Sequence, residues 1–124
     1  MEKYSIKEVS ERLNISPYTL RYYEKERVIA EVSRNSQGIR EYDENDVNWL
    51  EFVNCFKETG MSLADIKTIV SLSIGPDSSK TISQRKAILL NHRVKVLERI
   101  EEMQKNLAKV DYKISHYERM EKEN

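Results

Sequence analysis

Three side chains suited to contacting nucleic acid recur at helical spacing near the start of the chain. Tyr18, Arg21 and Tyr22 stand at positions i, i+3 and i+4, so a helix would present them on one outward face. Arginine and tyrosine bond to phosphate oxygens, and arginine also reads base edges. Most charged helix faces are simply solvated, so this pattern alone leaves DNA binding and a solvated face both open.

A second pair of basic side chains flanks a turn. The sequence Asn35-Ser36-Gln37-Gly38 has turn chemistry and separates two β-prone segments, 28–34 and 39–42. This spacing predicts a hairpin with Arg34 on one strand and Arg40 on the other. Beside a helix-turn-helix, such a hairpin is called a wing, and it offers a second surface for contact with DNA.

Two short helices are predicted ahead of this hairpin. Ser5 and Glu8 have the spacing of a capping box, in which each side chain accepts from the other residue's amide. Asn14 tolerates the left-handed conformation that ends a helix. Ser16 precedes a proline, a pattern typical of a helix start, and begins a second helix over about 17–26. Two helices joined by a turn of about three residues indicate a helix-turn-helix.

Two supporting helices should follow the hairpin. The acidic residues in 43–46 suit the positive end of a helix dipole, so a third helix is expected to begin there and to end at Gly60. Ser62 is expected to start a shorter, fourth helix. Residues 74–80 break the helical pattern. We therefore expect a mostly helical fold, in which a winged helix-turn-helix DNA-binding domain with two supporting helices spans 1–73 and a linker spans 74–80.

A long coiled-coil dimerisation helix is predicted over 81–119, with a frayed tail over 120–124. No proline or glycine interrupts residues 81–117, and apolar residues repeat every seven positions in two offset sets. This pattern is a heptad seam. The seam residues are Leu89, Val96, Ile100, Met103, Leu107, Val110, Ile114 and Tyr117.

The seam needs a partner, because an isolated helix cannot bury it. A second copy of the chain would cover it, or the helix would dock on its own domain. Eight side chains at about 1.5–3 kcal/mol each, if fully buried, could offset an association cost of about 4–15 kcal/mol. We therefore expect a homodimer.

Length, net charge and the distribution of apolar residues exclude several classes of protein. The 124 residues and 14.7 kDa suit one domain, or a small domain with an appendage. The 21 basic and 21 acidic side chains give zero net charge, so any DNA affinity must come from local placement. No apolar run reaches the length of about 18 residues that a membrane helix needs, and the start lacks a signal-peptide pattern. We expect a cytoplasmic protein with no membrane partner.

The sequence offers no pattern of catalytic or metal-binding residues. It has no glycine-rich phosphate loop, no nucleophile at a plausible spacing from a base and no cluster of His, Asp and Glu. We expect neither enzymatic activity, nor a cofactor, nor a metal. Zero net charge and the seam also permit another function, a coiled-coil adaptor whose small domain binds protein and not DNA. A steep loss of affinity with rising salt distinguishes a DNA binder from such an adaptor.

The only cysteine, Cys55, lies in the expected third helix beside Phe52 and Phe56. A free cysteine is usually a small buried apolar residue. Its polar neighbours Asn54 and Glu58 make this helix face only half apolar, which keeps a reactive sensor thiol open as the alternative.

Several of these segments strongly resemble the amino-terminal half of MerR-family transcription regulators. The likeness covers about residues 4–70, and the Leu-Arg-Tyr-Tyr-Glu string is its most specific part. The matching segments are Tyr4-Ser5-Ile6-Lys7-Glu8-Val9-Ser10, Asn14-Ile15-Ser16, Thr19-Leu20-Arg21-Tyr22-Tyr23-Glu24, Gly38-Ile39-Arg40-Glu41-Tyr42, Phe56, Gly60-Met61-Ser62-Leu63 and Asp65-Ile66.

The resemblance implies a dimeric winged-helix regulator whose long helix pairs antiparallel with that of its partner. In the family, the dimer binds a two-fold site in a promoter whose spacer between the −35 and −10 elements is too long for RNA polymerase. It bends and untwists this DNA until the elements align. Ile39 stands where family members often carry tyrosine. Carried over to this chain, the DNA contacts would come from Ser16, Tyr18, Thr19, Arg21, Tyr22, Arg34 and Arg40.

The resemblance also bears on the effector. Because the chain ends soon after the long helix, we do not expect the drug-binding domain of some members. No paired cysteines follow the helix, so we do not expect the family's metal-sensing loop either. Gly38-Ile39-Arg40 and Asn54-Cys55-Phe56 look like the branch that responds to aldehydes and other thiol-reactive electrophiles. Cys55 is therefore the candidate sensor, and its modification would shift how the third helix supports the DNA-binding unit.

Overall fold

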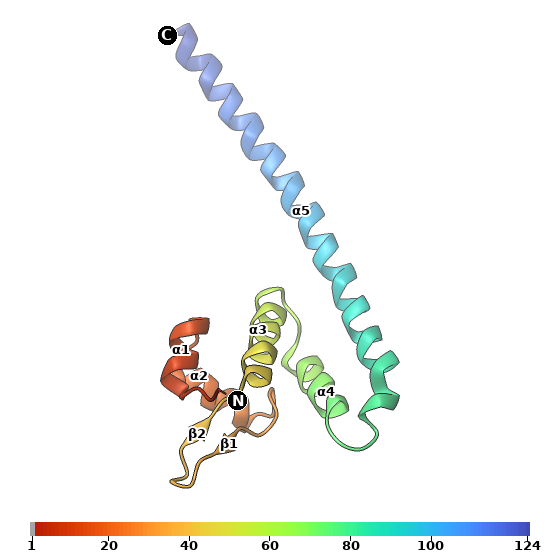
Figure 1. Cartoon of the computed structure of the whole chain (residues 1–124). Coiled ribbons are helices and arrows are strands. Elements are labelled where there is room, and N and C mark those ends of the chain that lie inside the picture. The colour runs from red at the N-terminus through yellow and green to blue at the C-terminus, as the bar shows by residue number, and fades with distance from the viewer. Residues whose placement is uncertain (1) are drawn as a thin grey trace. The chain divides into compact units, whose positions relative to one another are not determined.

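A computed structural model describes residues 2–124 and separates them into two compact units, one ending at Ile88 and the other comprising Leu89–Asn124. Figure 1 labels the helices and strands along the chain. In chain order, they are α1 (Ile6–Leu13), α2 (Pro17–Lys25), β1 (Ser33–Arg34), β2 (Arg40–Glu41), α3 (Glu44–Glu58), α4 (Leu63–Ser73), the short 3₁₀ helix η1 (Ser78–Thr81) and α5 (Ile82–Glu123).

Caps define the two helices of the predicted helix-turn-helix. The Ser5 hydroxyl accepts from the Glu8 amide at 3.1 Å and the Glu8 carboxylate accepts from the Ser5 amide at 3.0 Å, which is the expected capping box. Asn14 adopts a φ of 55°, in the left-handed region, and ends α1 as predicted. Ser16 caps α2. The three-residue turn and both helices of the prediction are confirmed.

The wing is shorter than predicted. β1 and β2 have two residues each, pair antiparallel and place Arg34 opposite Arg40. The apolar part of the first β-prone segment is not a strand, because Val28, Ile29 and Val32 are buried in the helical core. Their side chains face the core from a loop, whose backbone is not paired with a neighbouring strand.

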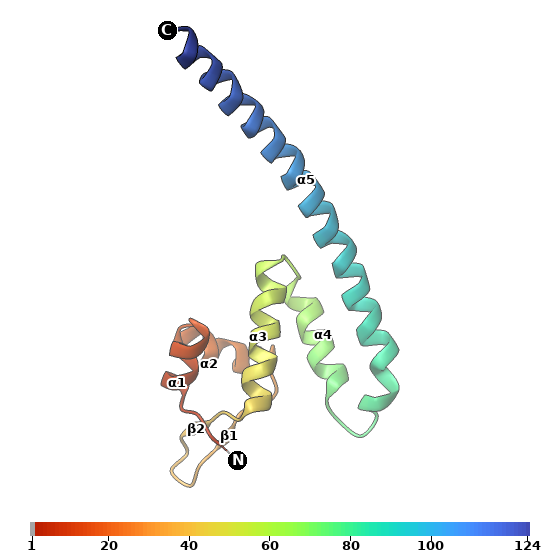
Figure 2. The same ribbon diagram turned by 45° about the horizontal axis from the view of Figure 1, so that its top comes forward.

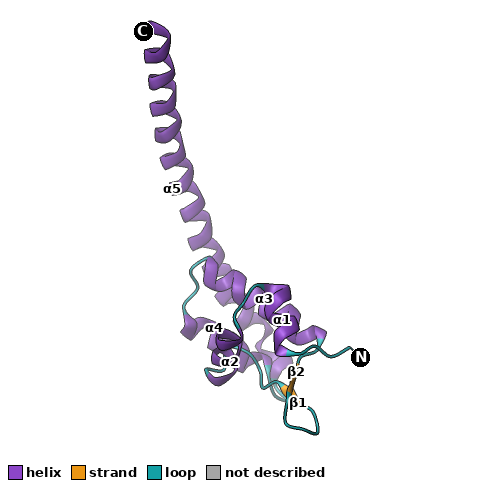
Figure 3. Cartoon of the chain, turned by 90° about the vertical axis from the view of Figure 1, so that its left-hand side faces the viewer, coloured by secondary structure: helices purple, strands orange, loops and turns teal. Residues whose placement is uncertain are grey.

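The hairpin turn follows from Asn35 and Gly38. The Asn35 carboxamide oxygen accepts from the amides of Gln37 and Ile39, at 2.9 and 3.0 Å. Gly38 closes the turn by donating to the Asn35 carbonyl at 2.9 Å with a φ of 79°, a conformation that glycine adopts at low cost. Figure 3 shows the hairpin projecting from the helices of its unit.

The supporting helices complete the first unit. Asp43 and Asp46 form a second capping box at the start of α3, and Ser62 caps α4. In Figures 1 and 2, α3 lies between α2 and α4. The core between these helices contains fully buried aliphatic side chains and one tyrosine: Val9, Leu20, Val28, Tyr42, Val47, Leu50, Val53 and Ile66.

The first unit extends beyond the predicted boundary. The division falls after Ile88, inside α5, and not at the 74–80 linker. The first turns of α5 belong to this unit because Ile88 packs against the core and Arg85 bonds to Thr81 at 3.1 Å and to the Ser78 carbonyl at 2.8 Å. The apolar residues at the start of α5 therefore include Ile88, which packs on the core of the first unit, as well as residues of the heptad seam.

The second unit is the remainder of α5, a helix that contains no buried residue. The frayed tail expected over 120–124 is wrong for all but the last residue, since α5 continues to Glu123. Lys, Glu, Arg and Met are good helix formers, and no Gly or Pro stops the helix. No helix among the described residues is long and apolar enough to cross a membrane.

Candidate nucleic-acid interface

One face of α2 is exposed in the manner that the sequence predicts. Leu20 and Tyr23 are buried and fix the rotation of the helix against the core. Tyr18 is then 77% exposed, and Arg21 and Tyr22 are also exposed. These three side chains form an outward surface with one guanidinium and two phenols.

The start of α2 adds small hydroxyl groups. The Ser16 hydroxyl accepts from the Thr19 amide at 3.1 Å and donates to the Thr19 hydroxyl at 2.9 Å. Ser16 is exposed and Thr19 is half-buried. Because the positive end of the helix dipole lies here, this end of α2 suits a phosphate group.

The two wing arginines have different environments. Arg34 is exposed, and its guanidinium donates to the Gly38 carbonyl across the turn at 3.1 Å. Arg40 is half-buried, and its Nε bonds to a carboxylate oxygen of Glu24 at 2.6 Å. Arg34 is therefore held close to its own loop, whereas Arg40 is attached to the helix α2.

Sequence reasoning gave no role to Glu24. Its second carboxylate oxygen accepts from the Val32 amide at 3.1 Å, so Glu24 bonds to the chain on both sides of the hairpin. A signal was present in the sequence, because Glu24 lies one turn after Arg21. An acid beside a face predicted to bind phosphate is favoured by a cationic partner, and Glu24 has one in Arg40.

The base of the wing is tied to the amino-terminal segment. Tyr4 and Tyr42 exchange two backbone hydrogen bonds, at 2.7 and 2.8 Å. The Tyr4 hydroxyl donates to Glu44 at 2.5 Å, and this bond, together with one to Glu2, raises the pKa of Tyr4 to about 12. Hydrogen bonds from Tyr4 and then from Arg12 lower the pKa of Glu44. These bonds join the segment before α1 to the start of α3.

The phenol of Tyr42 lies beneath this region in the core. Its side chain is fully buried, and its hydroxyl has no hydrogen-bond partner among the described residues. Burial raises the pKa of Tyr42. The group is therefore a neutral packing element at the point where the wing joins α3.

Cys55 is exposed on α3, which contradicts the alternative of a small buried residue. The reason is the rotation of α3, which turns Val47, Leu50 and Val53 into the core. Phe52 is also exposed, at 57%, and stacks on Phe56 with ring centroids 6.2 Å apart. The thiol is thus accessible in this unit.

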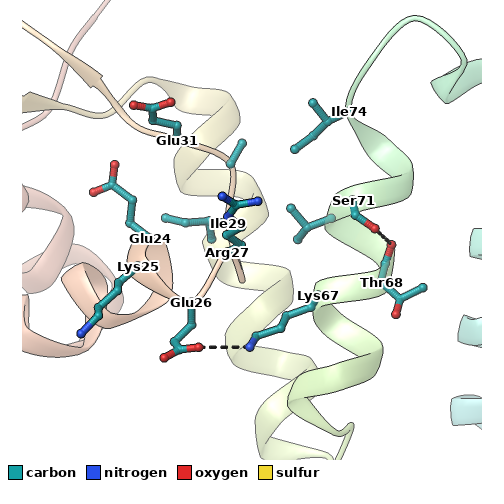
Figure 4. A pocket seen from close by; sticks show the side chains of 12 residues that line it. Glu24, Lys25, Glu26, Arg27, Ile29, Glu31, Lys67, Thr68, Ser71 and Ile74 are labelled. Atoms are coloured by element: carbon teal, nitrogen blue, oxygen red, sulfur yellow. Dashed lines mark hydrogen bonds and ion pairs between the residues drawn. The ribbon is translucent and has the colours of Figure 1, made fainter.

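A separate open cleft of about 1130 Å³ lies between α4 and the segment that ends α2 (Figure 4). A Glu26–Lys67 ion pair of 3.1 Å spans it. The residues that line it include neither Cys55 nor any of the side chains predicted to contact DNA. No group of three or more His, Cys, Asp or Glu among the described residues could hold a metal.

The fold and this surface define a winged helix-turn-helix DNA-binding protein. A family description of the MerR HTH family regulatory protein matches residues 4–72, and one of the MerR DNA-binding region matches 47–113. The chain therefore belongs to the MerR family of transcription regulators. It is a DNA-binding regulator, and its relatives are regulators and not enzymes.

Individual relatives agree with this assignment. An uncharacterized HTH-type transcriptional regulator of Haemophilus influenzae is 35% identical over 116 residues, which are 94% of this chain and 84% of the relative. The crystal structure of HiNmlR, a MerR family regulator lacking the sensor domain and bound to promoter DNA, matches with a TM-score of 0.85 and 35% identity. The match covers 95% of this chain and 92% of HiNmlR. A MerR-family regulator from Bacillus thuringiensis matches with a TM-score of 0.81 and 32% identity, over 92% and 98% of the two chains.

Proposed function

We propose that a homodimer of this chain binds a two-fold promoter site in an over-long spacer and distorts the DNA, so that RNA polymerase can engage both promoter elements. The observation on which this rests most is the arrangement of an exposed Tyr-Arg-Tyr face on α2 beside an arginine-bearing wing. The likeness to HiNmlR, whose structure contains promoter DNA, supports the same mode of binding. Membership in this family also disfavours the coiled-coil adaptor.

The proposed contacts divide between two elements. Tyr18, Arg21 and Tyr22 would read the DNA from α2, with Ser16 and Thr19 beside a phosphate at its start. Arg34 and Arg40 would contact the backbone from the wing, Arg40 through guanidinium nitrogens other than the Nε that bonds to Glu24. Phosphate contacts on both elements would position the protein and hold the DNA in its deformed shape.

The dimer would form through α5. The seam residues are exposed in the single chain, except Val96, which is half-buried. A helix with this much uncovered apolar surface needs a partner. By the family resemblance, the partner helix runs antiparallel, which would give the two DNA-binding units the two-fold relation that a two-fold site requires.

Selection of genomic fragments by the purified chain at near-physiological salt tests this function. We expect a small set of two-fold sites in promoters with over-long spacers. Lengthening or shortening the spacer of a recovered promoter should then change transcription in opposite directions. Fragments without symmetry, or no enrichment at all, would refute the proposed mode of regulation.

We further propose that Cys55 senses aldehydes or related electrophiles. The exposed thiol could add to an aldehyde carbonyl. The sulfur–carbon bond would form as the carbonyl π pair moves to oxygen, which would take the thiol proton and give a hemithioacetal without any oxidant. The adduct would lie beside Phe52, on the helix that supports the DNA-binding unit.

Replacement of the thiol tests the sensor. Cys55→Ser and Cys55→Ala should both keep operator affinity and lose the transcriptional response to aldehyde. Thermal unfolding serves as the control, because a purely structural thiol would instead lower the midpoint in both variants. An unchanged aldehyde response in the two variants would eliminate Cys55 as the sensor.

A further inference from the structure

We propose that Glu24 is a positioning residue that fixes the wing at a set distance from α2, so that both elements can hold distorted DNA together. This inference rests on the proposed distortion of the promoter. Phosphate repels a carboxylate, so Glu24 is not expected to contact DNA itself. Its role is instead to hold the wing in place relative to α2.

The carboxylate of Glu24 is fully engaged. One oxygen bonds to Arg40 Nε at 2.6 Å, and the other accepts from the Val32 amide at 3.1 Å. The side chains of Glu24 and Arg40 are 11% and 24% exposed, so water screens this pair less than a surface pair. Val32 directly precedes β1, and Arg40 begins β2. One side chain therefore fixes both strands relative to α2.

The hairpin has few other attachments. Residues 33–41 contribute no buried side chain, and the bonds of Arg34 and Asn35 remain within the turn. Buried Val32 and Tyr42 anchor its two ends. Among the described residues, Arg40–Glu24 is the only side-chain hydrogen bond that joins this hairpin to a helix.

The wing is therefore a hairpin that is fixed at its two ends by buried Val32 and Tyr42 and held along its length by the bond between Arg40 and Glu24. Bending DNA requires contacts that keep their spacing against the restoring force of the duplex. A wing without the Glu24 bond would yield to that force. Loss of the bond should therefore affect the binding of DNA that must be deformed more than the binding of DNA that already has the right spacing.

The test compares Glu24→Gln with Glu26→Gln. Both variants remove one negative charge from the end of α2, but Glu26 pairs with Lys67 across the cleft and makes no bond to the wing. Simple electrostatics predicts slightly tighter DNA binding in both. The glutamine oxygen at position 24 can still accept from the Val32 amide, which preserves the fold. Circular dichroism of both variants checks folding.

The probe is an end-labelled promoter fragment recovered with the wild-type chain, together with the same fragment shortened by about two base pairs in the spacer. Energy transfer between the ends reports the bend, and titration gives the dissociation constant. We expect Glu24→Gln to bind the over-long fragment about tenfold more weakly and to bend it less, with a smaller loss on the shortened fragment. Glu26→Gln should differ from wild type by less than about twofold.

The outcomes separate the two hypotheses. If wild type binds without changing the end-to-end distance, the proposed function fails. If wild type bends the DNA and Glu24→Gln matches Glu26→Gln, only the role of Glu24 is overturned. Arg40→Gln is the second variant in case Glu24→Gln is unfolded. It should reduce the bend at least as much, because it also removes a proposed contact with the DNA backbone. The double variant should be no worse than Arg40→Gln if the pair acts as a unit.

Discussion

The two units of this chain bury their apolar side chains in different ways. The unit that ends at Ile88 encloses a core in which Leu20, Leu50 and Ile66 are fully buried. The unit Leu89–Asn124 repeats apolar residues at similar frequency, yet none of them is buried. Periodicity alone therefore does not decide burial. A helix buries its apolar face only if the chain also supplies a surface to cover it.

This difference has a thermodynamic consequence. The core of the first unit is formed within one chain, so we expect its free energy of unfolding not to depend on protein concentration. The helix of the second unit would be stabilised by association, and its stability should rise with concentration. Substitutions in the two regions should therefore give distinguishable signatures.

The largest effect should come from a charge in the seam. Leu107→Asp places a carboxylate in the apolar interface of the proposed dimer, twice per dimer. We expect a loss of about 4–6 kcal/mol in dimer affinity, or about a thousandfold or more, and a parallel loss of operator binding. Sedimentation velocity over a range of concentrations measures the change.

Tyr112→Asp is the matched control for this substitution. Tyr112 is on the same helix and is 70% exposed, against 56% for Leu107, but it lies outside the heptad seam. The control should remain a dimer. If both variants dissociate, or if neither does, the seam is not the dimer interface.

A core substitution should give the opposite signature. Leu50→Ala removes a fully buried side chain from α3 and should lower the free energy of unfolding by about 2–5 kcal/mol. Denaturant titration followed by near-ultraviolet circular dichroism at several protein concentrations measures it. The loss should be the same at each concentration. A loss that depends on concentration would show that folding of the first unit is coupled to dimerisation.

Much of this architecture follows from local sequence signals. The caps at Ser5, Ser16 and Asp43 fix helix starts, because their side chains accept from amides within the same turn. The left-handed conformation at Asn14 is also predictable. These features depend on only a few consecutive residues, so they can be read without knowing the tertiary fold.

The features that escaped prediction depend on distant residues. The pairing of Glu24 with Arg40 joins positions 16 apart, and burial of Val28 and Val32 from a loop depends on the helical core. Arg27 has a φ of 59° although it is not a glycine, and it lies between the C-cap of α2 and Val28, which is buried in the core. Likewise, the exposure of Cys55 depends on which face of α3 is covered.

A surface substitution should separate stability from DNA binding within the first unit. Arg21→Ala should leave thermal stability unchanged and weaken operator binding by about 1–3 kcal/mol. If Arg21 reads a base, discrimination between sites should relax. If it contacts phosphate, all sequences should weaken together and the salt slope should fall by about one.

Lys80→Ala is the control for charge, since it removes one exposed cation from the η1 segment outside the proposed interface. Fluorescence anisotropy at several salt concentrations measures both variants. Equal effects of the two substitutions would remove Arg21 from the interface and leave only a general electrostatic contribution.

The smallest effect should be a change in pH dependence at the amino-terminal edge of the first unit. Hydrogen bonds to Glu44 and then to Glu2 raise the pKa of Tyr4 from its ordinary value of 10.0 to about 12 in the folded chain. The folded state thus holds the phenol proton more tightly than the unfolded state. The stabilisation is fully present below pH 10 and is lost as the pH rises toward 12.

Tyr4→Phe removes this titration together with the bond to Glu44. The variant should be less stable than wild type below pH 10, and the difference should shrink between pH 10 and 12, because ionised Tyr4 no longer donates and is repelled by the carboxylate. Thermal midpoints measured across this range for wild type, Tyr4→Phe and the α5 control Tyr112→Phe give the comparison. A difference that stays constant across this range would mean that ionisation of the phenol does not weaken its contribution, so the hydrogen bond to Glu44 is not what stabilises this edge. The amino-terminal segment would then be held by its backbone bonds to Tyr42 and not by the bond to α3.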